Sequence, residues 1–231
     1  MTILLTGSSR GIGAAIHSAL AGTGAAVIGH GTRSGIAADF ADPAAPRALW
    51  DAALDQAGGT IDVLVNNAGV FEANALSRAH DDWVADWERT LRINLTAAAE
   101  LCRLAVRHWQ ERGTGGRIVN VASRAAYRGD SPAHWHYAAA KAGMVAMTKT
   151  IAWGYASEGI LAFAICPGFT MTGMAEDYLA SRGGDRLLAD IPLGRVASPD
   201  EVASVARYCA LDAPASMTGA VIDVNGASYV R

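Results

Sequence analysis

The sequence predicts an α/β protein: a Rossmann-like, doubly wound parallel sheet of about seven strands in a single domain. Short apolar runs such as 61–65 and 161–166 alternate along the chain with longer stretches of helical periodicity. A glycine-rich turn joins the first apolar run to the first helical stretch. The 231 residues contain no internal repeat or low-complexity linker, so we expect one domain over residues 1–231.

The composition, at 51% hydrophobic and 18% charged residues, is that of a soluble globular protein. A net charge of −3 provides no basic field for nucleic acid. No apolar run reaches the roughly 20 residues of a membrane span, and the strand-like start leaves no room for a signal peptide. Cys102, Cys166 and Cys209 are odd in number and widely spaced, which favours reduced thiols over a disulfide or zinc site. We therefore expect a cytoplasmic protein without nucleic-acid or membrane partners.

The first strand, at 3–6, runs into a turn with the spacing Gly7-x-x-x-Gly11-x-Gly13, where a helical pattern begins. Strand, glycine turn and helix in this order present free backbone N–H groups and a positive dipole end to a phosphate. The spacing differs from the common Gly-x-Gly-x-x-Gly fingerprint, and an ordinary glycine turn is the alternative. The residues expected to bind phosphate are Gly7, Ser9, Arg10, Gly11, Ile12 and Gly13.

The second strand, at 25–29, ends where a dinucleotide site distinguishes its two cofactors. An acidic residue there binds the free ribose 2′-hydroxyl of NAD, whereas an arginine accommodates the 2′-phosphate of NADP. This chain has Thr32, Arg33 and Ser34 at that point and no carboxylate, and Arg10 adds a second cation. We therefore expect NADP(H) to be preferred, with NAD(H) possible. A solvated loop arginine is the alternative.

A third strand is predicted at 35–40, too close to the second for a full crossover helix between them. Asp39 is placed to accept a hydrogen bond from the adenine amino group, and Phe40 to pack on the adenine ring. Equally, Asp42 before Pro43 is a helix N-cap for a helix at 43–57.

The fourth strand, at 61–65, runs into Asn66-Asn67-Ala68-Gly69. Small residues at the carboxyl end of a strand allow a cofactor to approach the backbone closely. Asparagine side chains there hold the loop through backbone groups, and a plain turn is the alternative. The expected cofactor contacts are Asn67, Ala68 and Gly69.

A long helix is predicted over 81–112, with tryptophans that we expect in the core and in a subunit contact. Asn94 lies inside it, where its helix propensity is poor. It is either simply exposed or marks a local break that frees a backbone carbonyl for water. The fifth strand, at 117–122, ends at Ser123, which is placed to hold a substrate oxygen. No Gly-x-Ser-x-Gly elbow is present, so Ser123 is not interpreted as a nucleophile.

Tyr137 and Lys141 lie four residues apart at the start of a helix to about 157, so their side chains share one face. A phenol has a pKa of about 10, and a nearby cation favours the phenolate and lowers that pKa. The pair therefore predicts an acid/base group that works near pH 7. Tyr-x-x-x-Lys is a weak pattern by itself, and a surface pair on an alanine-rich helix is the alternative.

The sixth strand, at 161–166, is closed by Pro167-Gly168. The segment 170–197 has helical spacing interrupted by glycines, which suits a substrate lid. Ser198 to Glu201 form a capping box that opens a last helix to about 211, and a seventh strand follows at 221–224. We expect either an apolar substrate pocket or ordinary packing for Tyr127, Trp135, Phe169, Met171 and Met174. His134 and His136 lack a third ligand at usable spacing, so we expect no metal.

These motifs together resemble the short-chain dehydrogenases/reductases, in their compact single-domain branch. The resemblance covers nearly the whole length. The shared positions are Thr6, Gly7, Gly11, Ile12, Gly13, Asn66, Asn67, Ala68, Gly69, Asn94, Ser123, Tyr137, Lys141, Pro167, Gly168 and Thr172. Two features depart from the family pattern: the helix between the second and third strands is missing, and Ser123 lies one residue farther than usual before Tyr137.

The resemblance implies a role for each matching position. Tyr137 is the general acid/base, Lys141 lowers its pKa and holds the nicotinamide ribose, and Ser123 bonds the substrate carbonyl. Asn94 holds a water that links Lys141 to solvent. The Gly7–Gly13 loop binds pyrophosphate, residues 67–69 flank the adenosine ribose, and Pro167, Gly168, Thr170 and Thr172 border the nicotinamide.

The implied activity is NADPH-dependent, reversible reduction of a ketone or aldehyde carbonyl to an alcohol. The chain is similar to 3-oxoacyl-carrier-protein reductases and to NAD-dependent sugar-alcohol dehydrogenases, which stay open as alternatives. A different class is a member without catalysis that senses nucleotide or scaffolds partners, and an intact Asn94–Ser123–Tyr137–Lys141 set argues against it. The family is usually tetrameric, so we expect a homotetramer or a homodimer.

Overall fold

The computed structural model describes residues 1–171 and 188–231. Its strands are β1 (Thr2–Leu5), β2 (Ala26–Gly31), β3 (Ile36–Ala37), β4 (Val63–Asn66), β5 (Gly116–Val121), β6 (Ile160–Pro167) and β7 (Val221–Val224). Its longer helices are α1 (Gly11–Ala21), α2 (Ala45–Gln56), α3 (His80–Leu91), α4 (Ala97–Arg112), α6 (Trp135–Tyr155) and α9 (Pro199–Arg207). The shorter ones are η1 (Arg92–Thr96), α5 (Ala125–Arg128), η2 (Ala156–Glu158), η3 (Tyr208–Asp212) and η4 (Ala215–Met217).

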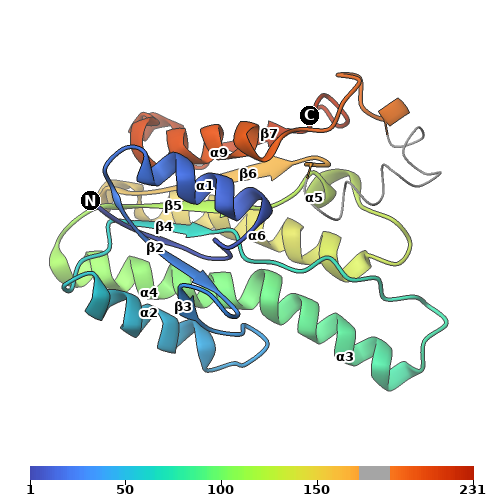
Figure 1. Ribbon diagram of the computed structural model, residues 1–231, viewed down its shortest axis with the longest axis horizontal. Coiled ribbons are helices and arrows are strands. Elements are labelled where there is room, and N and C mark those ends of the chain that lie inside the picture. The colour runs from blue at the N-terminus through green and yellow to red at the C-terminus, as the bar shows by residue number, and fades with distance from the viewer. Residues whose placement is uncertain (172–187) are drawn as a thin grey trace.

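The strands form one parallel sheet of seven, in the order β3-β2-β1-β4-β5-β6-β7. Helices cover both faces, with α1 and α9 on one side and α2, α4 and α6 on the other (Figure 1). The predicted Rossmann-like, doubly wound fold is therefore confirmed. None of the described helices is both long and apolar enough to cross a membrane.

The central strands are buried on both faces, which explains why they are apolar throughout instead of alternating. In β1, Leu4 packs toward α2 and α4, whereas Ile3 and Leu5 pack toward α1 and α9. Successive strand side chains point to opposite faces, so one short strand contributes to two separate cores. Because all seven strands run parallel, their carboxyl ends lie at the same edge of the sheet.

The connection between β2 and β3 is the feature that most distinguishes this sheet. The structure describes all of it, residues 32–35, and it contains no helix, as the sequence predicts. The third strand is shorter than predicted, because it ends at Ala37. The Asp39 side chain then accepts a hydrogen bond from the Ala41 N–H at 3.0 Å and turns the chain. Asp42 likewise binds the Ala44 N–H at 2.9 Å in the turn before α2, so it does not cap that helix.

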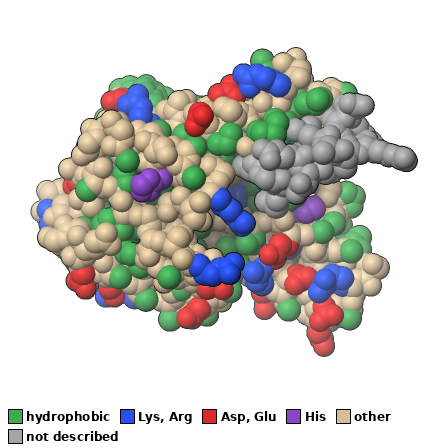
Figure 2. All heavy atoms as spheres, viewed as in Figure 1, with side chains coloured by type: hydrophobic (Ala, Val, Ile, Leu, Met, Phe, Trp, Pro, Cys, Tyr) green, Lys and Arg blue, Asp and Glu red, His purple; other side chains and the backbone are tan. Residues whose placement is uncertain are grey.

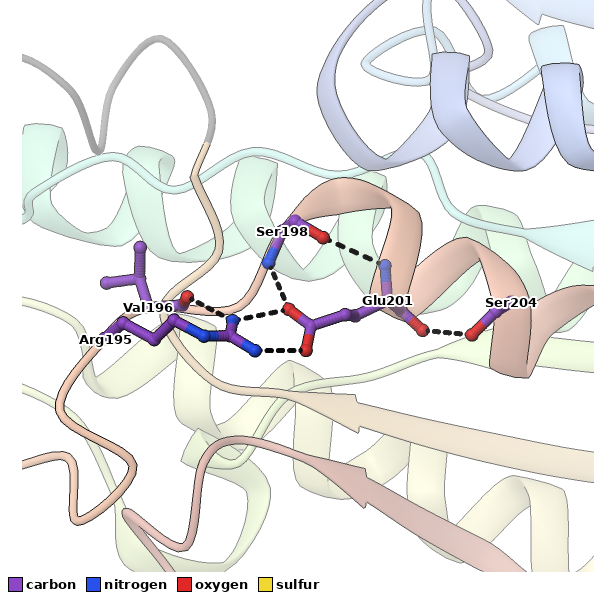
Figure 3. A network of polar contacts seen from close by, with 5 residues as sticks. All are labelled: Arg195, Val196, Ser198, Glu201 and Ser204. Carbon is purple, nitrogen blue, oxygen red and sulfur yellow. Dashed lines mark hydrogen bonds and ion pairs between the residues drawn. The ribbon is translucent and has the colours of Figure 1, made fainter.

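The start of α9 is held by the predicted capping box (Figure 3). The Ser198 hydroxyl accepts from the Glu201 N–H at 3.2 Å, and the Glu201 carboxylate accepts from the Ser198 N–H at 2.7 Å. Arg195 donates two hydrogen bonds of 2.8 Å to the same carboxylate. These contacts lower the pKa of Glu201 to about 2 and fix the direction in which the chain enters α9.

Of the tryptophans predicted on the long helix, only Trp109 lies in the core. It is 1% exposed, and its indole N–H donates to the Ile61 carbonyl at 2.7 Å. Trp83 and Trp87 are partly exposed and stack on each other with ring centroids 5.4 Å apart. The predicted core position is therefore confirmed for Trp109, whereas Trp83 and Trp87 lie outside the core and a subunit contact for them stays a prediction.

Gly116, at the start of β5, leaves the room that the Trp109 indole fills. A Cβ at this position would lie 2.1 Å from the ring. We expect Gly116→Ala to lower the free energy of unfolding by about 1–3 kcal/mol, because the core must be overpacked. The control is Gly154→Ala on the exposed side of α6, where no atom lies within 4 Å of the new methyl. It should raise stability by about 0.5–1 kcal/mol. Urea denaturation of the two variants measures both values, and equal stabilities would contradict the packing argument.

Candidate active site

The glycine-rich loop ends at a helix start that is open to an anion. Arg10 occupies the N-cap position of α1 in an extended conformation, and no described side chain caps the helix. The N–H groups of its first turn therefore remain for another acceptor. A Cβ on Gly13 would lie 1.9 Å from the Gly7 carbonyl oxygen, so α1 packs directly on the loop. This arrangement leaves donors for an anion, and phosphate binding by this loop stays a prediction.

His30 holds this loop from the end of β2, a role that the sequence did not reveal. Its Nδ1 accepts from the Gly7 N–H at 3.2 Å, and its Nε2 lies 3.0 Å from the Ala38 carbonyl, to which it donates. The ring is 3% exposed and stacks on Phe40 with centroids 4.5 Å apart. Burial lowers the pKa of His30, so the neutral ring is the form that makes both contacts.

Phe40 is a core residue, and this corrects one prediction. It is 5% exposed, and its ring packs on His30, so it does not present a face to an adenine. Asp39 is exposed, with one carboxylate oxygen already bonded to Ala41. Thr32, Arg33 and Ser34 are all exposed at the end of β2, which leaves their side chains accessible to a ligand.

Asn67 holds the loop after β4 against the glycine-rich loop, as predicted. Its amide donates to the carbonyls of Thr6 and Gly7 at 3.1 and 3.0 Å. In return, the Thr6 hydroxyl accepts from the N–H groups of Asn67 and Ala68, both at 3.0 Å. The carboxyl ends of β1 and β4 are thus tied together, and Gly69 remains exposed beside them.

Asn94 lies in η1, a π-helical turn that joins α3 to α4. It is fully buried, and its amide makes reciprocal hydrogen bonds of 2.8 Å with the N–H and carbonyl of Val70. The predicted local break is therefore confirmed, and the alternative of an exposed asparagine is wrong. A Cβ on Gly69 would lie 3.0 Å from the Asn94 oxygen and 3.7 Å from Lys141 Nζ. The structure thus brings Asn94, Gly69 and Lys141 to one place.

Ser123 follows the end of β5, and its hydroxyl lies near enough to the phenol of Tyr137 on α6 to influence the pKa of that phenol. Burial raises the pKa of Tyr137 to about 12, and the nearby Ser123 hydroxyl only partly opposes this. The prediction of a lowered phenol pKa is wrong for this structure. Burial disfavours the charged phenolate, and this effect outweighs the others that act on Tyr137.

Lys141 is 4% exposed and directs its ammonium at the backbone. Its Nζ donates to the Val121 carbonyl at 2.8 Å and lies 5.7 Å from the centroid of the Tyr137 ring. Burial lowers the pKa of Lys141 to about 8. A group with this pKa is still mostly protonated at pH 7, so Lys141 keeps most of its charge despite its burial.

The last predicted cofactor contacts follow β6. Pro167 ends the strand, a Cβ on Gly168 would lie 2.9 Å from Asn225 Cα, and the Thr170 hydroxyl donates to the Gly168 carbonyl at 3.3 Å. Thr172 and most of the predicted lid, residues 172–187, lie outside the described part of the chain.

The predicted apolar pocket is not assembled as expected. Tyr127 stacks on Tyr229, whereas Trp135 is 52% exposed and contacts Trp83. Met171 is 36% exposed, and Met174 lies outside the described residues. Instead, Phe71 approaches Tyr137 edge-on with centroids 4.8 Å apart. Phe71 lies in the loop just after Gly69, but nothing in its own residue type or spacing marks it as a site residue.

His134 stacks on the Phe71 ring, with the two ring centroids 3.9 Å apart. Across residues 1–171 and 188–231, no group of His, Cys, Asp and Glu is arranged to hold a metal ion. The face in Figure 2 is hollowed near its middle, and Lys and Arg side chains lie around the hollow.

The fold and this site define a single-domain, dinucleotide-binding α/β oxidoreductase. A family model described as "Enoyl-(Acyl carrier protein) reductase" matches residues 7–227. A 3-oxoacyl-[acyl-carrier-protein] reductase of Vibrio cholerae is 35% identical, covering 98% of this chain and 96% of its own. D-threitol dehydrogenase of Mycolicibacterium smegmatis is also 35% identical, with 99% and 92% covered.

Two solved structures from Agrobacterium tumefaciens are similar over 100% of this chain and 96% of theirs. One is a putative 2-deoxy-D-gluconate 3-dehydrogenase with bound NADP, with a TM-score of 0.87 and 28% identity. The other is a putative gluconate dehydrogenase, with a TM-score of 0.89 and 30% identity. The chain belongs to the short-chain dehydrogenase/reductase family, whose members are NAD(P)-dependent oxidoreductases acting on alcohol and carbonyl groups.

The buried neutral His30 predicts loss of stability in acid. Its folded pKa is lowered, so below the unfolded pKa of about 6.5 the unfolded chain binds a proton that the folded chain does not. The free energy of unfolding should fall as pH drops below that value, by up to about 1.4 kcal/mol per pH unit from this residue. His30→Asn, which keeps an acceptor for Gly7, should reduce that slope.

Urea denaturation at pH 8.0, 6.5 and 5.5 checks this. The comparison at pH 8.0 is the control, because the imidazole is neutral there in both states. Equal slopes for the wild type and His30→Asn below pH 6.5 would contradict the assignment.

Proposed function

We propose that this protein is an NADP(H)-dependent oxidoreductase that reduces a ketone or aldehyde carbonyl to an alcohol, reversibly. The observation that carries the proposal is that the Ser123 and Tyr137 hydroxyls lie together, with the Lys141 ammonium buried one helical turn away and held by the Val121 carbonyl. Two hydroxyl groups that meet in this way converge on the position of a single substrate oxygen. They do so at the carboxyl edge of the sheet, where open α/β sheets bind ligands.

In this proposal Ser123 holds the substrate oxygen, and Tyr137 donates a proton to it during reduction. A phenol with a pKa of about 12 is protonated throughout the neutral range, which suits the acid role. The bound cofactor supplies the hydride. Lys141 stabilises the phenolate that remains after proton transfer. Asn94 fixes the loop at Val70, and the π-helical turn around it is where a water would connect Lys141 with solvent.

NADP(H) is the proposed cofactor. The residues that would hold it are the glycine-rich loop, residues 67–69, Lys141, and the segment after β6. Arg33, Thr32 and Ser34 are exposed at the end of β2, where an arginine accommodates a 2′-phosphate. The NADP in the similar Agrobacterium tumefaciens structure supports this choice.

The second candidate is a 3-oxoacyl-[acyl-carrier-protein] reductase, which the names of several relatives favour. A polyol or sugar-acid dehydrogenase is supported by the threitol enzyme and by the two solved structures. A panel of small ketones, oxo acids and carrier-linked oxoacyl substrates, tested with both cofactors, separates these possibilities. Binding of NADPH without turnover of any carbonyl would instead support a non-catalytic sensor.

We also propose that the whole chain acts as one catalytic domain, in the cytoplasm, as a homotetramer. Three free, buried cysteines suit a reducing compartment. Trp153 on α6 is 90% exposed, and a large apolar side chain so accessible is a feature of subunit contacts. Size-exclusion chromatography with light scattering tests the assembly.

Tyr137→Phe removes only the phenolic oxygen. We expect turnover with a ketone and NADPH to fall by at least about 1,000-fold, because the proton donor is lost. The cofactor dissociation constant should change by less than about threefold. Tyr155→Phe, on the same helix, is the control. Steady-state kinetics and fluorescence titration make the comparison, and near-normal turnover in Tyr137→Phe would overturn the role assigned.

Arg33→Ala should weaken NADPH more than NADH, because only NADPH carries the 2′-phosphate. A charge-assisted hydrogen bond contributes about 1.5–3 kcal/mol, so the dissociation constant for NADPH should rise about 10- to 100-fold while that for NADH changes little. Arg107→Ala on α4, which removes an exposed ion pair with Glu111, controls for net charge. Equal effects on the two cofactors would remove the basis for the cofactor choice.

A further inference from the structure

Arg124, the residue after Ser123, is a buried cation without a counter-ion. It is 9% exposed, and among the described residues it takes part in no ion pair. Its Nη1 is buried and has no hydrogen-bond partner in the part of the chain that the structure describes. Arg124 was not predicted as an anion site, because its burial and its unpaired donor become visible only in the fold.

The surroundings of Arg124 are apolar on one side and leave one of its buried donors without a partner. One face of the guanidinium lies over the Phe169 ring, 4.8 Å from the centroid. A stacked guanidinium presents its N–H groups in the plane, in a fork that matches a carboxylate. Burial is the main cause that lowers the pKa of Arg124, and Arg128 lowers it further. Both effects make an anionic partner favourable.

The nearby carboxylates are engaged elsewhere. Asp190 pairs with Arg128 at 3.8 Å, and Asp130 accepts a hydrogen bond from the Ser131 N–H at 2.7 Å. They act on Arg124 only through weaker charge effects that raise its pKa. A buried charge is costly unless it is paired, so an anion supplied from outside would relieve a cost that the described residues leave uncompensated.

Arg124 belongs to the same edge of the sheet as the catalytic hydroxyls. Its N–H donates to the Pro167 carbonyl at 2.9 Å, which joins the end of β5 to the end of β6. Ser123 precedes it, and Phe169 follows the predicted nicotinamide border at Pro167 and Gly168. The backbone of Arg124 therefore joins two strand ends that also flank the proposed position of the reacting carbonyl, and its guanidinium contacts Phe169 just beyond the second of them.

We propose that Arg124 binds a carboxylate of the substrate, so that the substrates are oxo acids and the corresponding hydroxy acids. This inference rests on the proposed carbonyl reduction. A carboxylate is favoured over a phosphate because a single planar guanidinium matches one monoanionic, planar group. The reaction is a carbonyl reduction in which carbon gains a hydride from NADPH, oxygen gains a proton from Tyr137, and the carboxylate is unchanged.

The test compares substrates that differ only in charge. Pyruvate, acetoacetate and 4-oxopentanoate are each measured against their methyl esters with NADPH, and dihydroxyacetone phosphate provides the phosphate arm. The wild type should favour at least one oxo acid over its ester by about 100-fold in kcat/KM, the scale of two charge-assisted hydrogen bonds. In Arg124→Met that ratio should fall to about one, mainly through KM, and Arg124→Lys should recover part of it.

Arg128→Met is the matched control, because it removes the same charge from the next turn of α5 and should keep the wild-type ratio. Equal use of acids and esters by the wild type would overturn the carboxylate site while leaving carbonyl reduction intact. Selectivity for the phosphate alone, or an unchanged ratio in Arg124→Met, would also overturn it.

A binding measurement separates this inference from the proposed function. With NADP⁺ present, succinate should raise the melting temperature of the wild type and of Arg128→Met, but not that of Arg124→Met. If no carbonyl is reduced but succinate still stabilises the protein through Arg124, the proposed function fails and the anion site stands. If carbonyls are reduced and succinate has no effect that depends on Arg124, the anion site fails alone.

Discussion

The hydrogen bond from Lys141 to the Val121 carbonyl joins α6 to the end of β5, and the arrangement of the site depends on it. Val121 is the last residue of β5, and Ser123 lies two positions beyond it. Tyr137 lies one turn before Lys141 on the same face of α6. Fixing the lysine to the strand end therefore brings the phenol to the serine hydroxyl. An ammonium has three donors, and this bond uses one of them.

A second constraint holds the dinucleotide side of the sheet. Without a crossover helix, residues 32–35 would tie β3 only weakly to the rest. His30 compensates, because its two ring nitrogens bind Gly7 of the glycine-rich loop and Ala38 just beyond β3. The Phe40 ring stacks on one face of the His30 imidazole. The connection between β2 and β3 is short, and the buried His30 at the end of β2 provides the anchoring that a crossover helix would otherwise provide.

The sequence was most informative where local chemistry decides the structure. Apolar runs located the strands, and the capping box at Ser198 located the start of α9 with no tertiary information. Asn94 was flagged by its poor helix propensity, and the π-helical turn bears this out. The predictions failed where the burial of a side chain depends on residues that are far apart in the chain. Phe40 and His30 face each other only after folding, and Phe71 and Arg124 acquire their surroundings from segments distant in the chain.

The pKa of Tyr137 is the most instructive of these wrong predictions. The sequence correctly placed Tyr137 and Lys141 on one face of a helix, but the predicted direction of the pKa shift was wrong. Proximity to a cation and burial act in opposite directions, and only the structure shows that burial prevails here. Burial also lowers the pKa of Lys141. An anion held at this edge favours the protonated lysine, but it also disfavours the phenolate directly, because two negative charges repel each other. A substrate carboxylate at Arg124, the residue after Ser123, would therefore keep Tyr137 protonated, which is the form that donates a proton during carbonyl reduction.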